Sequence, residues 1–367
     1  MTKGFGSPDV AAALTRARDL LDETAHPIEA LRALGGLCNY HLIRSEAPKM
    51  LQLAEPYLRR RVDRQSLMIG HYEVGTAYLH IGKFEDARFH LEWGVSRYDE
   101  ESSRAMAFIA GTHVRTFWLV WLSLTYLYLG RLRLATETIE AAVADARSRL
   151  HPFTLVSALL ASARFFLHTR NLQAAIAATD EGLAIATEQR SPYHISRANI
   201  LKAVNVVEGG RAEEGISLMD RALVEHRKTG ANFQSSFNLS CLADAHAHAG
   251  NYERAIDFAD QAIREIERTG ERWWAAEAQR IKGKILLAAT PADGRRAENC
   301  FRAALKSAQG QKARFWELRA AHSLASLLNR EGRDAQARRL LAPIHGEFND
   351  GLDLPDLDDA RRLLNRL

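Results

Sequence analysis

The chain has 367 residues, of which 47% are hydrophobic and 26% charged, values that are ordinary for a folded, water-soluble protein. Its 49 Lys and Arg against 45 Asp and Glu give a net charge of only +4, too small for the dense basic patch that marks a nucleic-acid partner. The 3 cysteines lack the spacing of a metal site or a disulfide framework, so we expect a cytoplasmic protein without metal or cofactor.

The first predicted element is a capping helix within residues 1–27, formed by Pro8–Glu23. The N-terminal residues lack the apolar core of a signal peptide. A helix in this position would cover the apolar face of the unit that follows, because the end units of a repeat array need such caps.

An internal repeat with a period of about 40 residues organises the chain from residue 28 onward. Each unit carries a small residue early in its second helix, which we call the marker residue. A second small residue usually follows seven positions later, so that both lie on one stripe of the helix. Neighbouring helices can approach closely along such a stripe. The first small residue recurs at Ala47, Ala87, Ala135, Ala175, Gly215, Ala255, Ala297 and Ala337. The second recurs at Ala54, Gly94, Ala142, Gly182, Ala222, Ala262 and Ala304.

The remaining positions of the unit define two helices joined by a short turn. In the first helix, a small residue usually stands twelve positions before the marker residue, and a bulky residue usually follows that small residue three positions later. Turn glycines then occur at Gly82, Gly130, Gly210, Gly250 and Gly332. This pattern resembles the tetratricopeptide repeat, with a period of 40 rather than 34 residues. The resemblance implies an all-α solenoid, a right-handed superhelix of about eight hairpins between residues 28 and 350. The units are expected near 28–63, 64–101, 112–150, 151–190, 191–230, 231–270, 271–311 and 312–350.

A narrower resemblance rests on segments such as RTGERWWAAEAQRIKGKILL and GLDLPDLDDARRLL. They are similar to the C-terminal repeat region of bacterial signalling proteins in which an adenylate/guanylate cyclase domain precedes a signal-transduction ATPase domain. The resemblance implies a regulatory role in bacterial signal transduction. The chain has no GxxxxGK[ST] phosphate loop and no cyclase domain before its repeats, and HExxH and GxSxG motifs are also missing. We therefore expect no enzymatic activity, and the chain is either a stand-alone protein or a fragment of a larger one.

Two features stand out before and within the third unit. Residues 102–112 add eight residues to the period, either as a specific partner contact or as a tolerated surface insertion. The run Thr116–Leu129 is the most apolar of the chain but is shorter than the ~20 residues that span a bilayer. We expect it to form a helix buried on nearly all sides, and membrane contact or self-association through Phe117–Leu129 is the alternative.

One aromatic residue opens the first helix of five successive units. Because it recurs in each unit, it is most simply a structural residue that packs against the end of the previous helix, and an aromatic ladder along the groove is the alternative. This column is Phe153, Tyr193, Phe233, Trp273 and Phe315. The neighbouring Trp274 shares an apolar helix face with Ala278, Ile281 and Ile285 and is predicted to belong to the core.

The first helices of a stacked array line its concave surface, which forms an extended groove. Seven positions before the marker residue, this groove carries His80, Tyr128, His168, Glu208, His248 and Arg330. Arg164, Arg197, Asp244 and Arg319 lie deeper in the predicted groove. These ten residues are the candidate contacts to a partner. The alternatives are a solvated helix end for the first set and salt bridges within the groove for the second. We expect no metal site, because one imidazole per helix converges poorly.

The last predicted element is a capping helix over residues 356–367, with Asp356 as its N-cap. Leu357, Leu363 and Leu364 would face inward, and Arg361, Arg362 and Arg366 would face outward.

Taken together, these patterns predict a non-enzymatic scaffold that binds a segment of a protein partner in its concave groove. Two alternatives stay open: a sensor that binds a peptide or small ligand within the superhelix and regulates a cyclase/ATPase-type protein, and a scaffold for homodimerisation. We expect neither a nucleic acid nor a membrane as partner.

Overall fold

The computed structural model describes residues 6–20, 26–59, 64–99, 113–290, 294–348 and 354–367. Every regular element in these ranges is an α-helix, which confirms the predicted all-α class. Helix α1 (Pro8–Leu20) precedes eight helical hairpins, and α19 (Pro355–Leu364) follows them. The hairpins are α2 (Pro27–Ile43) with α3 (Ala47–Arg59), α4 (Arg64–Ile81) with α5 (Phe84–Ser96), α7 (Val114–Tyr128) with α8 (Leu132–Ser148), α9 (Pro152–His168) with α10 (Leu172–Glu188), α11 (Pro192–Glu208) with α12 (Ala212–Lys228), α13 (Ser235–His248) with α14 (Tyr252–Thr269), α15 (Ala275–Ala289) with α16 (Gly294–Gly310), and α17 (Arg314–Arg330) with α18 (Asp334–Gly346).

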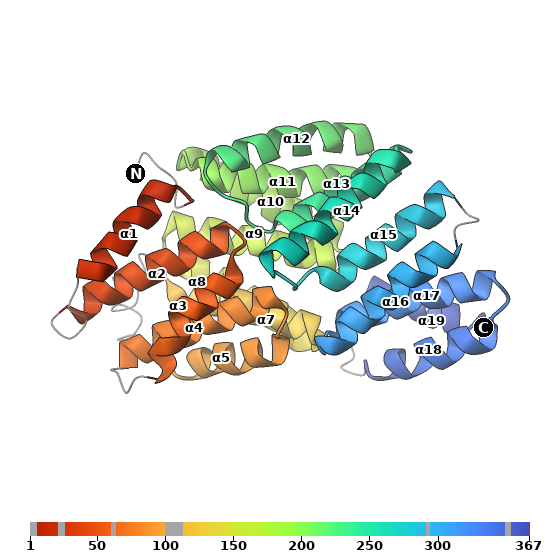
Figure 1. Cartoon of the computed structure of the whole chain (residues 1–367), viewed down its shortest axis with the longest axis horizontal. Helices are drawn as coiled ribbons and strands as arrows, with labels where there is room; N and C mark the ends of the chain where they lie inside the picture. Colours follow the sequence, from red (N-terminus) through yellow and green to blue (C-terminus); the bar gives the residue numbers. More distant parts are fainter. Residues whose placement is uncertain (1–5, 21–25, 60–63, 100–112, 291–293, 349–353) are drawn as a thin grey trace.

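The hairpins stack in chain order into a solenoid. Each helix packs most extensively on its sequence neighbour, and the first helix of each hairpin also contacts the first helix of the next, as α9 contacts α11 and α13 contacts α15. Figure 1 shows the hairpins following one another around the molecule, with the N-terminal helices on the left and α15–α19 on the right. The first helices therefore face the inside of the solenoid, where a ligand could bind.

The turn inside most hairpins contains a residue with a left-handed backbone. All five predicted turn glycines have positive φ, between 72° and 84°. Glycine adopts this conformation without a steric penalty, which is why it recurs at this position. Ser45 and Arg170 take the same place in the first and fourth hairpins, with φ of 60° and 61°.

The repeated small residues are buried where helices cross. Each alanine at the first marker position has no measurable exposure, and Gly215 is buried as well. At the second position, Gly94 of α5 packs against the indole of Trp118 in α7, which is fully buried. A Cβ atom on Gly94 would come within 2.6 Å of that ring. The small-residue stripe is therefore explained by close contact between helices.

The solenoid closes on itself along a line of contacts that we call the seam. The seam joins a hairpin turn in the first half of the chain to the segment before a first helix in the second half. In its first part, the Asn232 amide donates a hydrogen bond to the Ile43 carbonyl at 2.8 Å. In its second part, the Trp273 amide donates to the His80 carbonyl at 3.1 Å.

The seam continues towards the C-terminus with one contact for each of the next two units. Gly130 passes so close to Arg314 that a Cβ atom on the glycine would lie within 2.8 Å of the arginine. Arg170 then forms an ion pair with Asp359 of α19 at 2.6 Å. Each contact joins one unit to the fifth unit after it, with α19 standing in for a ninth unit.

The structure changes one of the terminal predictions and leaves another untested. The end expected for the first helix, Glu23, lies outside the described residues, as does the insertion 102–112. Asp356 does not cap α19, because the helix begins one residue before it and has Leu354 as its N-cap. The Asp356 carboxylate instead lies 3.4 Å from Arg319. Leu363 is buried and the arginines of this helix are exposed, as expected.

Helix α7 is buried along almost its whole length, as its apolar sequence predicted. No helix in the described part of the chain is both long enough and apolar enough to span a membrane.

We predict that Gly94→Ala lowers the free energy of unfolding by about 1–3 kcal/mol, because the added methyl group forces Trp118 out of its packed position. This loss outweighs the gain of up to about 1 kcal/mol that alanine brings within a helix. The matched control is Gly310→Ala in α16, where a Cβ atom meets nothing within 4 Å. Urea unfolding of both variants checks the prediction, and a Gly94→Ala variant as stable as the control would contradict it.

Candidate functional site

A cavity of about 500 Å³ opens inside the C-terminal half of the solenoid. We call it the channel pocket. Side chains from the first helices α9, α11, α13, α15 and α17 line it, together with residues of α12, α16 and α19. Its size is within the usual range for pockets that bind small ligands and short peptides.

The channel pocket brings together six of the ten residues predicted for the groove. They come from four different helices and meet because the first helices stack in register. They are His168, Glu208, Asp244, His248, Arg319 and Arg330.

One wall of the pocket is a fixed network of charges around Glu277, whose exposed fraction is 1%. Its carboxylate accepts hydrogen bonds from the Arg280 guanidinium at 2.7 and 2.8 Å, and Arg319 lies 3.2 Å away. Burial opposes ionisation of Glu277, but the two guanidiniums outweigh it and lower the pKa of this carboxyl. Arg319 also reaches Asp356, so this wall is tied to α19.

The sequence prediction missed Glu277 and Arg280. They lie on the same stretch of α15 as Trp274 and Ile281, which the sequence assigned to an apolar face. The available signal was an acid followed three residues later by a base on that face, a spacing that pairs side chains along a helix.

Three other charges in the pocket are not neutralised by the walls. No described carboxylate lies within ion-pair distance of Lys284 or Arg330, and no described cation lies within that distance of Glu208. Lys284 is exposed to the pocket, one helical turn after Arg280. Asp244 acts to raise the pKa of Lys284, but desolvation by the walls and the cations of Arg280 and Arg319 outweigh it and lower that pKa.

Between the pocket and the seam lies a buried group of rings that we call the aromatic cluster. Its members are Tyr128, His168, Phe237, Trp273, Trp274 and Trp316. His168 stacks on Trp274 with ring centres 5.2 Å apart and is 3% exposed. Burial and the cations of Arg164 and Arg319 hold the pKa of His168 well below its usual range, so the ring is neutral.

The aromatic cluster corrects the prediction for the start of the groove. His80 and Tyr128 were expected on a polar strip near the groove edge, yet both are buried, His80 against Trp121 and Tyr128 against Trp316. A solvated helix end is equally wrong for these two residues. The physical reason is the seam, which covers this part of the concave surface with the second half of the chain. Glu208, His248 and Arg330, which lie beyond the seam contacts, are exposed.

Arg164 and Arg197 do not reach the channel pocket. They line a separate cavity of about 20 Å³. The Arg164 guanidinium lies 5.5 Å from the Trp273 ring, and that of Arg197 lies 4.9 Å from the Phe233 ring. Burial lowers the pKa of Arg164 to about 10. Arg164 is thus part of the core, and it is not a surface contact.

The aromatic column divides into a buried and an accessible part. Phe233, Trp273 and Phe315 are buried, whereas Tyr193 is half-buried and Phe153 is 40% exposed. Trp273 packs across the seam as well as within its own unit, because its ring lies 6.1 Å from that of Tyr128. Trp274 is buried, as its helix face predicted, and it also lines the channel pocket.

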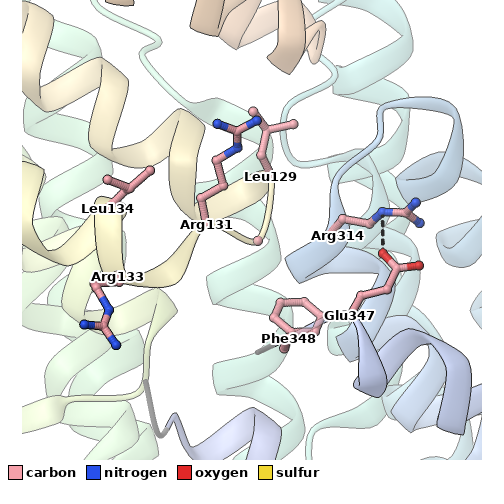
Figure 2. Close-up of a pocket in the computed structure, with 8 residues that line it drawn as sticks. Leu129, Arg131, Arg133, Leu134, Arg314, Glu347 and Phe348 are labelled. Atoms are coloured by element: carbon pink, nitrogen blue, oxygen red, sulfur yellow. Dashed lines mark ion pairs between the residues drawn. The ribbon is translucent and has the colours of Figure 1, made fainter. Parts of the chain in front are cut away.

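A second cavity, of about 490 Å³, lies across the seam. Figure 2 shows Leu129 and Arg131 on one side of it and the ion pair between Arg314 and Glu347 on the other. No side chain that lines it has a buried polar atom without a hydrogen-bond partner in the described part of the chain. The channel pocket contains such a group, because neither ring nitrogen of His168 has a partner. The channel pocket is therefore the stronger candidate site.

Comparison with known proteins places the fold in the class of tetratricopeptide-like solenoids, as found in Rap proteins. A Rap protein complexed with Competence and Sporulation Factor is similar over 93% of this chain and 99% of its own, with a TM-score of 0.63 and 13% identity. The Rap conjugation gene regulator of plasmid pLS20, in complex with the Phr peptide, is similar over 92% and 97%, with a TM-score of 0.53 and 10% identity. The tetratricopeptide repeat sensor protein of the signal-transduction ATPase class from Pyrococcus horikoshii covers 93% of this chain at a TM-score of 0.44 and 17% identity, the match spanning 53% of that protein.

No model of a protein family matches the sequence, and no curated protein matches it. The similarity to solved structures therefore describes the fold alone. The predicted relation to cyclase-containing proteins in particular has no support from these comparisons.

We predict a pH effect from Glu271, which lies in the segment before α15 and is 1% exposed. Burial raises its pKa from 4.5 to about 8. The folded state then holds a proton that the unfolded state has lost, so the free energy of unfolding falls as pH rises from about 4.5 to about 8. Glu271→Gln copies the neutral acid and removes this loss, about 1.4 kcal/mol for each unit of pKa difference.

The measurement is urea unfolding of parent and variant at pH 5, 7 and 8.5. We expect similar stability at pH 5 and a clear advantage for Glu271→Gln at pH 8.5. The exposed Glu267→Gln in α14 serves as the control. Parallel pH profiles for parent and Glu271→Gln would show that this carboxyl does not set the pH dependence.

Proposed function

We propose that the chain is a non-enzymatic regulatory module that binds a short peptide, or a short segment of a protein partner, in the channel pocket. The observation that carries the proposal is the pocket itself, where five first helices present apolar side chains and unpaired charges around one cavity. Peptide sites combine these features, because apolar walls supply affinity and a few polar groups supply orientation.

The geometry favours a short ligand over a long one. A long segment would have to follow the concave surface through the first half of the array. That path is filled by the chain's own aromatic cluster and by the buried Arg164. Between the two hypotheses from the sequence, a sensor of short peptides therefore fits better than a groove for an extended partner.

The third hypothesis, dimerisation through α7, has less support. It needed an exposed apolar face on that helix, and 13 of its residues, including Trp118 and Trp121, are buried. Homodimerisation through another surface stays an alternative. We further propose that the module acts in bacterial signal transduction, with a cyclase/ATPase-type protein as one class of target.

The complexes of similar fold support the peptide proposal. One Rap protein of this fold is complexed with Competence and Sporulation Factor, and another with the Phr peptide. The unpaired charges of the channel pocket, Lys284 and Glu208 among them, are suited to the two charged ends of a peptide.

We predict that Ser326→Trp abolishes peptide binding, because Ser326 lines the pocket and is only partly buried, so an indole there fills the cavity without entering the core. The assay incubates the chain with a random heptapeptide library, removes free peptide by size exclusion and identifies the retained peptides by mass spectrometry. We expect the parent to retain a defined subset and the variant to lose it at least tenfold.

The matched control is Ala303→Trp, which places the same side chain on an exposed site of the outer helix α16. It should bind like the parent. Thermal unfolding of both variants tests that they fold. If the parent retains no heptapeptide, or if Ser326→Trp retains the same subset as the parent, the channel pocket is not a peptide site.

A further inference from the structure

The channel pocket also indicates the chemistry of its ligand, an inference that rests on the proposed function. Two acids of the walls are already paired: Glu277 is bound by Arg280 and Arg319, and Asp359 is bound by Arg170. What they leave over includes an ammonium group without a contact partner. A ligand that complements these walls must therefore supply an anionic group for this ammonium.

Lys284 is that ammonium group. It lies on the same face of α15 as Glu277, Arg280 and Ile281, at spacings of seven, four and three residues, so it follows directly on the charged network. The Arg280 guanidinium is bound to Glu277, whereas Lys284 lines the pocket, is exposed, and has three N–H donors without a hydrogen-bond partner among the described residues. Asp244 acts to raise the pKa of Lys284, but desolvation and the cations of Arg280 and Arg319 lower it, so an anion in contact with the ammonium would stabilise its charged form.

His168 supplies a second, independent observation. The side chain is 97% buried and lines the pocket, yet neither ring nitrogen has a hydrogen-bond partner among the described residues. A buried polar group without a partner costs about 1–3 kcal/mol. A neutral imidazole offers one donor and one acceptor, and either of them can pair with a carbonyl or an amide of a peptide backbone.

Part of the remaining surface of the pocket is apolar. It is formed by side chains of the inner helices and of α12. They are Val204, Val207, Met219, Ile281, Leu287 and Leu327. Such a surface selects aliphatic or aromatic side chains next to the anion.

We infer that the channel pocket recognises a peptide carboxylate flanked by apolar residues, with the carboxylate on Lys284 and a neighbouring peptide bond on His168. A free C-terminus and an acidic side chain share this chemistry. The experiment is designed to separate them.

The test uses three pentapeptide libraries at equal concentration with the full chain. The first has free C-termini and no Asp or Glu, the second is its C-terminally amidated counterpart, and the third is amidated and contains Asp and Glu. Peptides retained after ultrafiltration are counted by mass spectrometry. We expect the first or the third library to be retained at least tenfold over the second, and the library that wins identifies the source of the carboxylate.

Variants link this result to named residues. Lys284→Met should reduce retention about tenfold, the effect of losing about 1.4 kcal/mol of a charge-assisted contact. Lys284→Arg should restore most of it, since it keeps the charge. The control Lys306→Met removes an exposed lysine of α16 that lies outside the pocket and should change nothing. His168→Phe keeps the ring packing and should weaken binding several-fold.

The possible outcomes separate the inference from the proposed function. Equal retention of all three libraries, or full retention by Lys284→Met, overturns the carboxylate inference and leaves peptide binding in place. No retention of any library contradicts both. Retention of the first or the third library that depends on Lys284 but not on Lys306 supports both.

Discussion

The seam is the constraint on which the rest of this structure depends. A stack of helical hairpins with one small-residue stripe per unit can remain an open solenoid, since each unit buries its apolar face on its neighbours. In this chain the backbone hydrogen bond from Trp273 to His80 holds one part of the solenoid against another. The contact turns a concave surface into a core, because side chains that would line a groove are enclosed between the two halves.

The channel pocket is what remains of the concave surface beyond these contacts. The members of the aromatic cluster that line it, His168, Phe237 and Trp274, form its floor. One wall is tied through Arg319 and Asp356 to α19, the helix that completes the seam. The charges of that wall are fixed by burial and mutual pairing, so they cost little reorganisation when a ligand arrives. The pocket thus combines a rigid floor with a few groups, such as Lys284, that have no fixed partner.

The sequence predicted those parts of the fold that are set by neighbours in the chain. Turn glycines and small residues recur because each unit makes the same local contacts, and the burial of α7 follows from its composition. The seam could not be predicted in this way. Its partners lie far apart, as with Ser45 and Asn232, 187 residues apart, and the match depends on the pitch of the whole superhelix.

The same reasoning explains the mixed result for the candidate site. Glu208, His248 and Arg330 lie in the pocket because they share a register on stacked helices, which the period reveals. His80 shares that register but lies under the seam, where a long-range contact decides its surroundings. The charges on α15 were missed for a different reason, because a buried network satisfies its own members and then resembles part of an apolar face.

The spacing of the seam also limits how such a protein can evolve. Open repeat arrays gain or lose units with little penalty, since each unit meets only its neighbours. Here each seam contact pairs a unit with the fifth unit after it, and α19 completes the series through Arg170 and Asp359. Inserting or deleting one hairpin between the paired units would shift every later contact out of register at once. The number of hairpins is therefore a fixed property of this architecture, much as the strand number is fixed in a closed β-barrel.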